Sequence, residues 1–215
     1  MSKKRYSWIP TVVLSILALA TPSLAADGKF DLGFRTDLGL GSGKPSNDII
    51  GFSLFGHYRL NDLWGVGFAI DHSPEFDFER TPEALGLATS QADDAKGTST
   101  TLSGWLERLY RRPEGQFEWF WNAGIGFNSV DMKDLSGTLV SGDAYDITTD
   151  AGGEFQMMFG VGARRWFGSG WGLELALHHD LHSADWKLTD RVSGATGTIS
   201  DYSVNTINLG FLKKL

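Results

Sequence analysis

Beyond Lys29, large apolar residues alternate with small or polar ones, and this alternation constrains the fold more than any other feature of the chain. The pattern begins with Phe30, Leu32 and Phe34, which are separated by Asp31 and Gly33. A period of two places the two kinds of residue on opposite faces of an extended strand, whereas a helix needs a period of 3.6. The sequence therefore predicts an all-β fold. It contains eight such runs, at about 30–40, 50–59, 64–71, 101–111, 117–128, 155–164, 171–180 and 206–215.

The connections between these runs alternate strictly in length. Short turns on one rim and long loops on the other are typical of barrels in the bacterial outer membrane, where the short turns are periplasmic. Prolines are expected only in connections or near the N-terminus, since proline cannot donate to a strand ladder. We therefore predict an eight-stranded antiparallel up-and-down transmembrane β-barrel. The short connections are 61–62, 112–116 and 168–170, and the long polar ones are 74–98, 131–154 and 181–200.

The fourth run is the one whose faces are hard to assign. Leu102, Leu106 and Tyr110 share a face with Arg108, while Trp105 lies on the opposite face. A β-bulge would shift the phase and reconcile the two.

The composition of the two faces distinguishes a membrane barrel from a soluble one. One face is large and apolar with almost no charge, as contact with lipid requires. The other is rich in glycine, which leaves room for long charged side chains in an interior that is narrow for eight strands. We expect opposite charges to pair there. The predicted lumen network consists of Asp31, Arg35, Arg59, Asp71, Glu118, Arg164 and Glu174.

Aromatic residues gather beside the short turns. Tryptophan and tyrosine are enriched where a membrane meets water. We therefore predict an aromatic girdle at the periplasmic interface, formed by Tyr58, Trp64, Tyr110, Trp119, Trp166 and Trp171.

The N-terminus has the layout of a secretory signal peptide. Basic residues at 3–5 precede an apolar stretch at 11–20, and Ser23 and Ala25 are small residues at the positions that a signal peptidase reads. We predict a signal peptide at 1–25 and the barrel at 26–215. Its removal would take the formal net charge from −7 to −10, which disfavours nucleic acid as a partner. The chain contains no cysteine, so disulfides and a lipid-modified cysteine are absent.

Over its whole mature length the chain resembles the small outer-membrane barrels of the OmpA, OmpX and OmpW type. The likeness lies in the segments GHYRLNDLWG (56–65), FGVGAR (159–164) and LGFLKKL (209–215). It implies a barrel recognised by the assembly machinery of the outer membrane and surrounded by membrane lipid and lipopolysaccharide. In such proteins the closing strand ends in an aromatic residue, whereas here Leu215 stands in that place and Lys213 interrupts the apolar stripe.

Two arrangements could support chemistry. His178, Asp180 and His182 share a face of the seventh run, and imidazole and carboxylate are metal ligands, although a loop entrance is an ordinary place for histidine. A barrel-type lipid A acyl hydrolase would need a histidine, a serine and an acid. His182 and Ser183 are adjacent, whereas that family separates them by one residue, so the match fails.

These observations favour a structural or cell-surface interaction role, with no catalytic residues, cofactor or metal, in a protein that is a monomer. The alternatives are a narrow channel for small apolar solutes and a lipid A-modifying enzyme. Acidic residues in the long loops, such as Glu75, Asp131 and Asp146, could bind divalent cations that bridge lipopolysaccharide, or they could simply keep the loops solvated.

Overall fold

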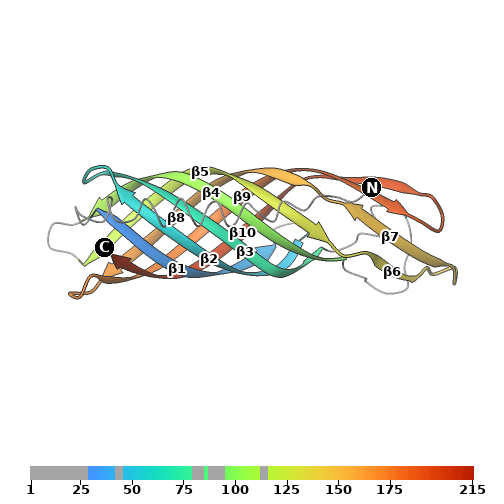
Figure 1. Cartoon of the computed structure of the whole chain (residues 1–215), viewed down its shortest axis with the longest axis horizontal. Coiled ribbons are helices and arrows are strands. Elements are labelled where there is room, and N and C mark those ends of the chain that lie inside the picture. Colours follow the sequence, from blue (N-terminus) through green and yellow to red (C-terminus); the bar gives the residue numbers. More distant parts are fainter. Residues whose placement is uncertain (1–28, 42–45, 79–84, 87–94, 112–115) are drawn as a thin grey trace.

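The computed structural model describes residues 29–41, 46–78, 85–86, 95–111 and 116–215, so the predicted signal peptide lies outside the described residues. Within them, one antiparallel sheet closes on itself as an elongated barrel (Figure 1). Eight strands form the barrel wall, in the order in which they follow one another along the chain, and β10 pairs with both β1 and β9 to close it. These strands are β1 (Phe30–Gly41), β2 (Ser46–Arg59), β3 (Trp64–Phe78), β4 (Ala95–Arg111), β5 (Phe117–Met132), β8 (Gly153–Trp166), β9 (Trp171–Asp190) and β10 (Thr196–Lys214). The predicted eight-stranded antiparallel barrel is thus confirmed.

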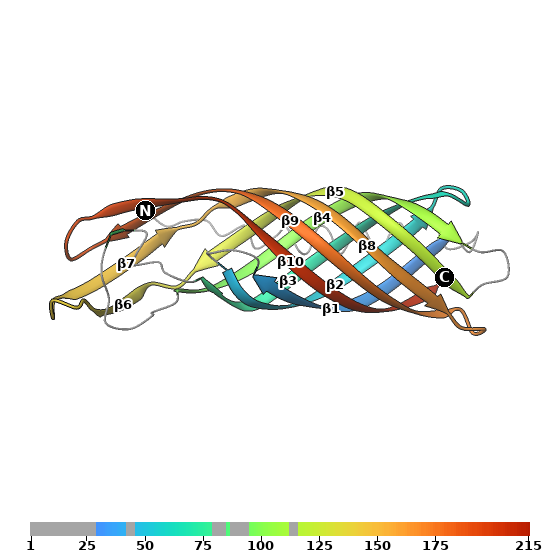
Figure 2. The ribbon, with the colours of Figure 1, turned by 180° about the vertical axis from the view of Figure 1, so that it is seen from behind.

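Two further strands extend the barrel at one end. β6 (Leu135–Thr138) and β7 (Ala144–Asp150) form a hairpin, and β7 pairs with the last residues of β9. Figure 2 shows this hairpin beyond one end of the barrel, opposite the end with the short turns. The segments 131–154 and 181–200, predicted as long polar connections, are not loops throughout, because much of both is strand.

The two faces of the wall exchange character along the strands. On β9 the outward residues are mostly apolar from Trp171 to Leu181 and then polar from Ser183 to Thr189, while the inward residues change from polar to apolar at the same level. Ten residues of a strand tilted by about 40° rise roughly 25 Å, which is the height of the apolar band of a membrane barrel. The strands therefore continue out of the membrane, and above it their apolar side chains point inward, as in a soluble protein.

An apolar core fills the barrel above the membrane band. Its buried side chains come from five strands, β3, β5, β7, β9 and β10, so it ties the hairpin to the barrel wall. They are Phe76, Val130, Met132, Tyr145, Ile147, Ala184, Trp186, Leu188 and Ile199.

Two local expectations for the strands were wrong. The register of β4 with its neighbours is continuous from Thr100 to Arg108, so no bulge shifts its phase there: Trp105 points into the barrel and Arg108 faces out. Pro74 lies within β3 and not in a connection, at a register shift between Ser73 and Phe76. A bulge removes the need for a ladder hydrogen bond and so accommodates a proline.

The outward band supplies a direct test of which face meets lipid. Leu175 is 55% exposed on the outer face of β9, whereas Thr189 is exposed on the same face above the band. We expect Leu175→Arg to lower the free energy of unfolding by about 2–4 kcal/mol, and Thr189→Arg to change it little, because only the first places a charge in hydrocarbon. Denaturant titration of both variants in phospholipid vesicles measures the difference, and equal effects would contradict the assignment of the faces.

Candidate functional site in the barrel interior

A cluster of charged side chains fills the barrel near the short turns, and Arg164 stands at its centre. Its guanidinium lies 2.6 Å from Glu174 Oε2, 2.6 Å from Glu107 Oε2 and 3.5 Å from Glu118 Oε1. Arg59 also contacts Glu118, at 2.8 Å. Arg164 and its three carboxylates are each 2% exposed or less, and buried charges are tolerated only when they are paired in this way. The fork geometry of arginine allows one cation to serve three partners.

His57 completes this cluster from β2. Its ring nitrogens lie 3.2 Å from Glu107 and 3.5 Å from Glu174. The predicted lumen network included neither His57 nor Glu107. Glu107 was missed because it lies in the strand whose phase was doubtful, although its two-residue separation from Trp105 places both on one face.

An apolar layer adjoins the charged cluster. Phe55, Trp105, Met158 and Leu212 are buried in contact with one another inside the barrel. The barrel wall beside them leaves no room for a side chain at Gly67, where a Cβ would lie only 2.1 Å from the ring of Trp105. Glycine on the inward face therefore makes room for a large neighbour here, and that neighbour is an aromatic ring instead of a charge.

A second ionic group lies apart from the first. The Arg35 guanidinium is 2.9 Å from Asp71 and 3.2 Å from Asp37, and the Ser53 hydroxyl lies between the two carboxylates, where it can donate its one hydrogen to either. The predicted lumen network is thus divided, with Arg35 and Asp71 in this group and four members in the Arg164 cluster. Asp31 is buried but makes no ion pair among the described residues, and its Oδ1 has no hydrogen-bond partner there.

Above Arg35 the interior holds a polar cavity of about 100 Å³, lined in part by the three residues considered as metal ligands. His178, Asp180 and His182 do share the inward face of β9. His178 Nε2 lies 3.3 Å from the Asn122 amide, while His182 lies 3.2 Å from Glu154 Oε2. No group of three histidine or carboxylate side chains in the described part of the chain is arranged to hold a metal ion. A cavity of this size and polarity suits a few bound waters.

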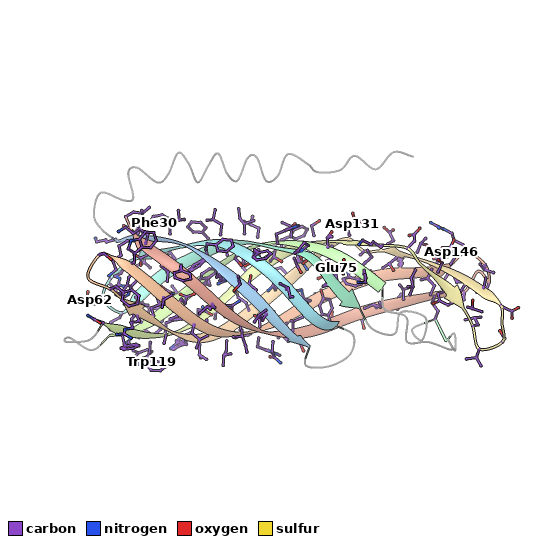
Figure 3. All side chains as sticks on the ribbon, turned by 90° about the horizontal axis from the view of Figure 1, so that it is seen from below. Phe30, Asp62, Glu75, Trp119, Asp131 and Asp146 are labelled. Atoms are coloured by element: carbon purple, nitrogen blue, oxygen red, sulfur yellow. The ribbon has the colours of Figure 1, made fainter. Side chains whose placement is uncertain are left out.

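Most of the predicted girdle does lie on the outer face near the short turns. Tyr110, Trp119 and Trp171 are 52%, 63% and 51% exposed, and Figure 3 shows Trp119 at the same end as Asp62. Tyr58 and Trp64 are half-buried on that face.

Trp166 differs from this expectation, because it is only 5% exposed and belongs to the apolar layer inside the barrel. The Lys214 ammonium lies 4.0 Å from the centre of its ring.

Some of the acidic residues of the opposite rim form ion pairs with basic side chains. Glu75 contacts Lys96 at 2.6 Å and Lys133 at 3.7 Å. The Arg191 guanidinium lies 3.1 Å from Asp146. These basic side chains thus neutralise part of the negative charge that cation binding would need.

A closed antiparallel barrel with an apolar outer band and a filled polar interior defines an outer-membrane β-barrel. The sequence profile of the outer membrane protein beta-barrel domain matches residues 11–212, so the chain belongs to this family. No curated protein sequence matches the chain. Among the described residues, no helix is long and apolar enough to cross a membrane.

Solved structures of three bacterial barrels are similar to this chain. The outer membrane protein OprG from Pseudomonas aeruginosa has a TM-score of 0.55 at 10% identity, covering 86% of this chain and 95% of that one. Neisserial surface protein A (NspA) gives 0.47 at 14% identity, with 86% and 96% covered. The Yersinia pestis attachment invasion locus protein Ail, in complex with a heparin analogue, gives 0.44 at 13% identity, with 86% and 95% covered. At 10% identity, the similarity to OprG shows a shared fold alone.

Proposed function

We propose that this protein is a non-conducting barrel of the bacterial outer membrane that holds a rigid extracellular extension for a structural or surface-interaction role. The observation that carries the proposal is the double filling of its interior. The Arg164 cluster occupies the barrel at the level of the membrane, and the apolar core around Trp186 occupies it above. Conduction needs a continuous wet path, and filling of the interior at two levels supports a closed barrel.

This extension, made of the β6–β7 hairpin and the parts of β9 and β10 above the apolar band, is a folded structure and not a set of loops. Ile147 and Trp186 are each 1% exposed within its core, and β7 is hydrogen-bonded along β9. Asp190 accepts hydrogen bonds from the backbone N–H groups of Asp146, Val192 and Ser193, which join the turn after β9 to the hairpin. A rigid surface loses little conformational entropy when it binds a partner.

The carboxylate of Asp190 is suited to this joining role at the pH outside a cell. Hydrogen bonds from the Ser193 hydroxyl and from backbone N–H groups lower the pKa of Asp190 from 3.8 to about 2. A depressed carboxyl pKa stabilises the folded state above the unfolded value, and this stabilisation is lost as the pH falls from about 4 toward 2. The hydrogen bonds to the ionised Asp190 carboxylate are therefore kept at neutral and at mildly acidic pH.

The arrangement of β9 supports a non-enzymatic role. His182 points into the barrel and is 8% exposed, while Ser183 lies on the outer face of the same strand. A general base must reach the nucleophile that it activates, and side chains on opposite faces of one strand point apart. We further propose that a signal peptide at 1–25 directs export, that the assembly machinery inserts the barrel, and that it works as a monomer among membrane lipid and lipopolysaccharide.

Conductance of the purified barrel in planar lipid bilayers tests the central claim. We expect no conductance steps from the native chain, because the Arg164 cluster and the apolar core around Trp186 both block the path. Steps of constant size that scale with the amount of protein would overturn the proposal in favour of a channel.

The absence of cysteine in the chain allows the orientation to be tested cleanly. Val140 is 66% exposed in the turn between β6 and β7, while Ser169 lies in the short turn between β8 and β9. We expect a membrane-impermeant maleimide to label Val140→Cys on whole cells but Ser169→Cys only after the outer membrane is opened. The reverse pattern would show that the extension faces the periplasm.

A further inference from the structure

A polar pair on β9 and β10 lies within the apolar outer band of the barrel. His179 is exposed on the outward face of β9, where its outward neighbours between Trp171 and Leu181 are apolar. Its Nδ1 lies 2.7 Å from Oδ1 of Asn205, which faces outward at the paired position of β10. An ionisable side chain on a lipid-facing surface is costly, and such residues are commonly retained for a function.

The pair lies in a groove of the outer wall. The groove has a volume of about 550 Å³, within the range of sites that bind small molecules. Its apolar walls come from four neighbouring strands, β5, β8, β9 and β10. They are formed mainly by Trp121, Phe159, Val161, Leu177 and Ile207.

The depth of the groove indicates which molecule can reach it. His179 lies eight residues beyond Trp171 on β9, a rise of roughly 20 Å from the periplasmic girdle for a strand tilted by about 40°. This level is close to the outer edge of the apolar band, where the acyl chains of outer-leaflet lipids meet their polar linkages. A lipid is already in contact with this surface, whereas a water-soluble ligand would have to enter the membrane first.

The chemistry of the pair defines what it would recognise. Because Asn205 Oδ1 accepts, the ring Nδ1 donates, and Nε2 remains an acceptor with no partner among the described residues. The Asn205 amide also offers N–H donors. The pair thus presents one acceptor and one donor, which match the N–H or O–H and the carbonyl found where an acyl chain joins a headgroup.

From these observations we propose that the groove binds one acyl chain of an outer-leaflet lipid, and that His179 and Asn205 hydrogen-bond to the ester or amide linkage at the head of that chain. This site is independent of the non-conducting role proposed above, since a barrel that conducts could bind lipid on its outer wall equally well.

Native mass spectrometry of the barrel in a mild detergent, titrated with phosphatidylethanolamine, tests occupancy of the groove. Val161→Trp would fill the groove, and Val66→Trp is its matched control, since Val66 is also exposed on the outer face but lies on β3. We expect one tightly retained lipid per native barrel, about tenfold weaker binding for Val161→Trp, and no change for Val66→Trp. Equal binding by the two variants would mean that only the surrounding annular lipid is seen. If the native barrel has the mass of two chains and Val161→Trp has the mass of one, the groove binds a second copy of this chain. Either result overturns the proposal.

A second comparison tests the polar pair separately from the groove. His179→Leu removes the imidazole, while Thr36→Leu removes a polar group from the lipid-facing side of β1 and serves as the control. We expect His179→Leu to weaken phosphatidylethanolamine binding by about fivefold, the worth of one hydrogen bond, and to leave binding of hexadecane unchanged. Equal loss for both probes, or no loss for either, would overturn the role given to His179.

Discussion

Replacing Arg164 with leucine is expected to prevent the barrel from folding stably. The change leaves Glu107, Glu118 and Glu174 buried with much of their compensating charge removed. Breaking a buried ion pair by deleting one partner costs about 3–5 kcal/mol, and three carboxylates share this partner. A heat-modifiability gel and urea titration in phospholipid vesicles measure the loss: the unboiled variant should migrate like the boiled protein, or unfold at much lower urea.

Two matched variants separate charge from packing in this experiment. Among the described residues Arg59 forms an ion pair with Glu118 alone, and its side chain is partly exposed, so Arg59→Leu should cost far less. Arg164→Lys keeps the charge but loses the fork, and we expect it to fold with intermediate stability. If Arg164→Leu and Arg59→Leu unfold at the same urea concentration, the Arg164 cluster does not have the central role assigned to it.

Truncating Trp186 to alanine is expected to loosen the extension above the membrane band while leaving the membrane part intact. Trp186 is 1% exposed, and removal of a buried tryptophan side chain costs about 3–5 kcal/mol. Because the core around it lies above the apolar band, the loss should fall on that part alone. Trypsin added to intact vesicles should cut at Arg191 or Lys187 at least tenfold faster than in the native protein, while the heat-modifiability shift persists.

Asp185→Ala supplies the control for this digestion, because it alters an exposed residue next to the same tryptophan without emptying the core or removing a trypsin site. Resistance of Trp186→Ala to trypsin would show that the extension does not depend on its apolar core. Loss of the gel shift would show that extension and barrel unfold as one unit.

The alternation of residues was sufficient to predict the barrel because each face meets only one environment within the membrane. The rule that the outer face bears no charge fails at the rim. Arg108 faces outward there, with its guanidinium 4.9 Å from the ring centre of Trp64 and 5.8 Å from that of Tyr110. A long cationic side chain can stay at the interface over aromatic rings, so its presence did not require a bulge.

The position of Trp166 could have been read from the sequence. It is two residues from Arg164, so any strand that turns Arg164 inward turns Trp166 inward too. Its nearness to a short turn suggested the girdle, but parity along the strand decides the face.

The extension above the membrane band was missed for a different reason. Ala184, Trp186 and Leu188 continue the alternation of β9, but on the face that is polar lower down. Read with one fixed assignment of faces, the segment looks like a polar loop. The pairing of Arg164 with Glu107 and the groove beside His179 depend on contacts between distant strands, and the spacing within any one strand does not encode them.

The exchange of faces along β9 also sets how far the protein can move along the membrane normal. A shift toward the periplasm by one pair of residues would draw Ser183 and then Asp185 into hydrocarbon, and the opposite shift would lift Leu181 into water. A barrel with a uniformly greasy exterior could adjust its height to a thicker or thinner bilayer, whereas this one has its immersion fixed by a sharp boundary. Bilayers whose hydrocarbon differs from roughly 25 Å must therefore deform around it, at a cost that rises with each ångström of mismatch.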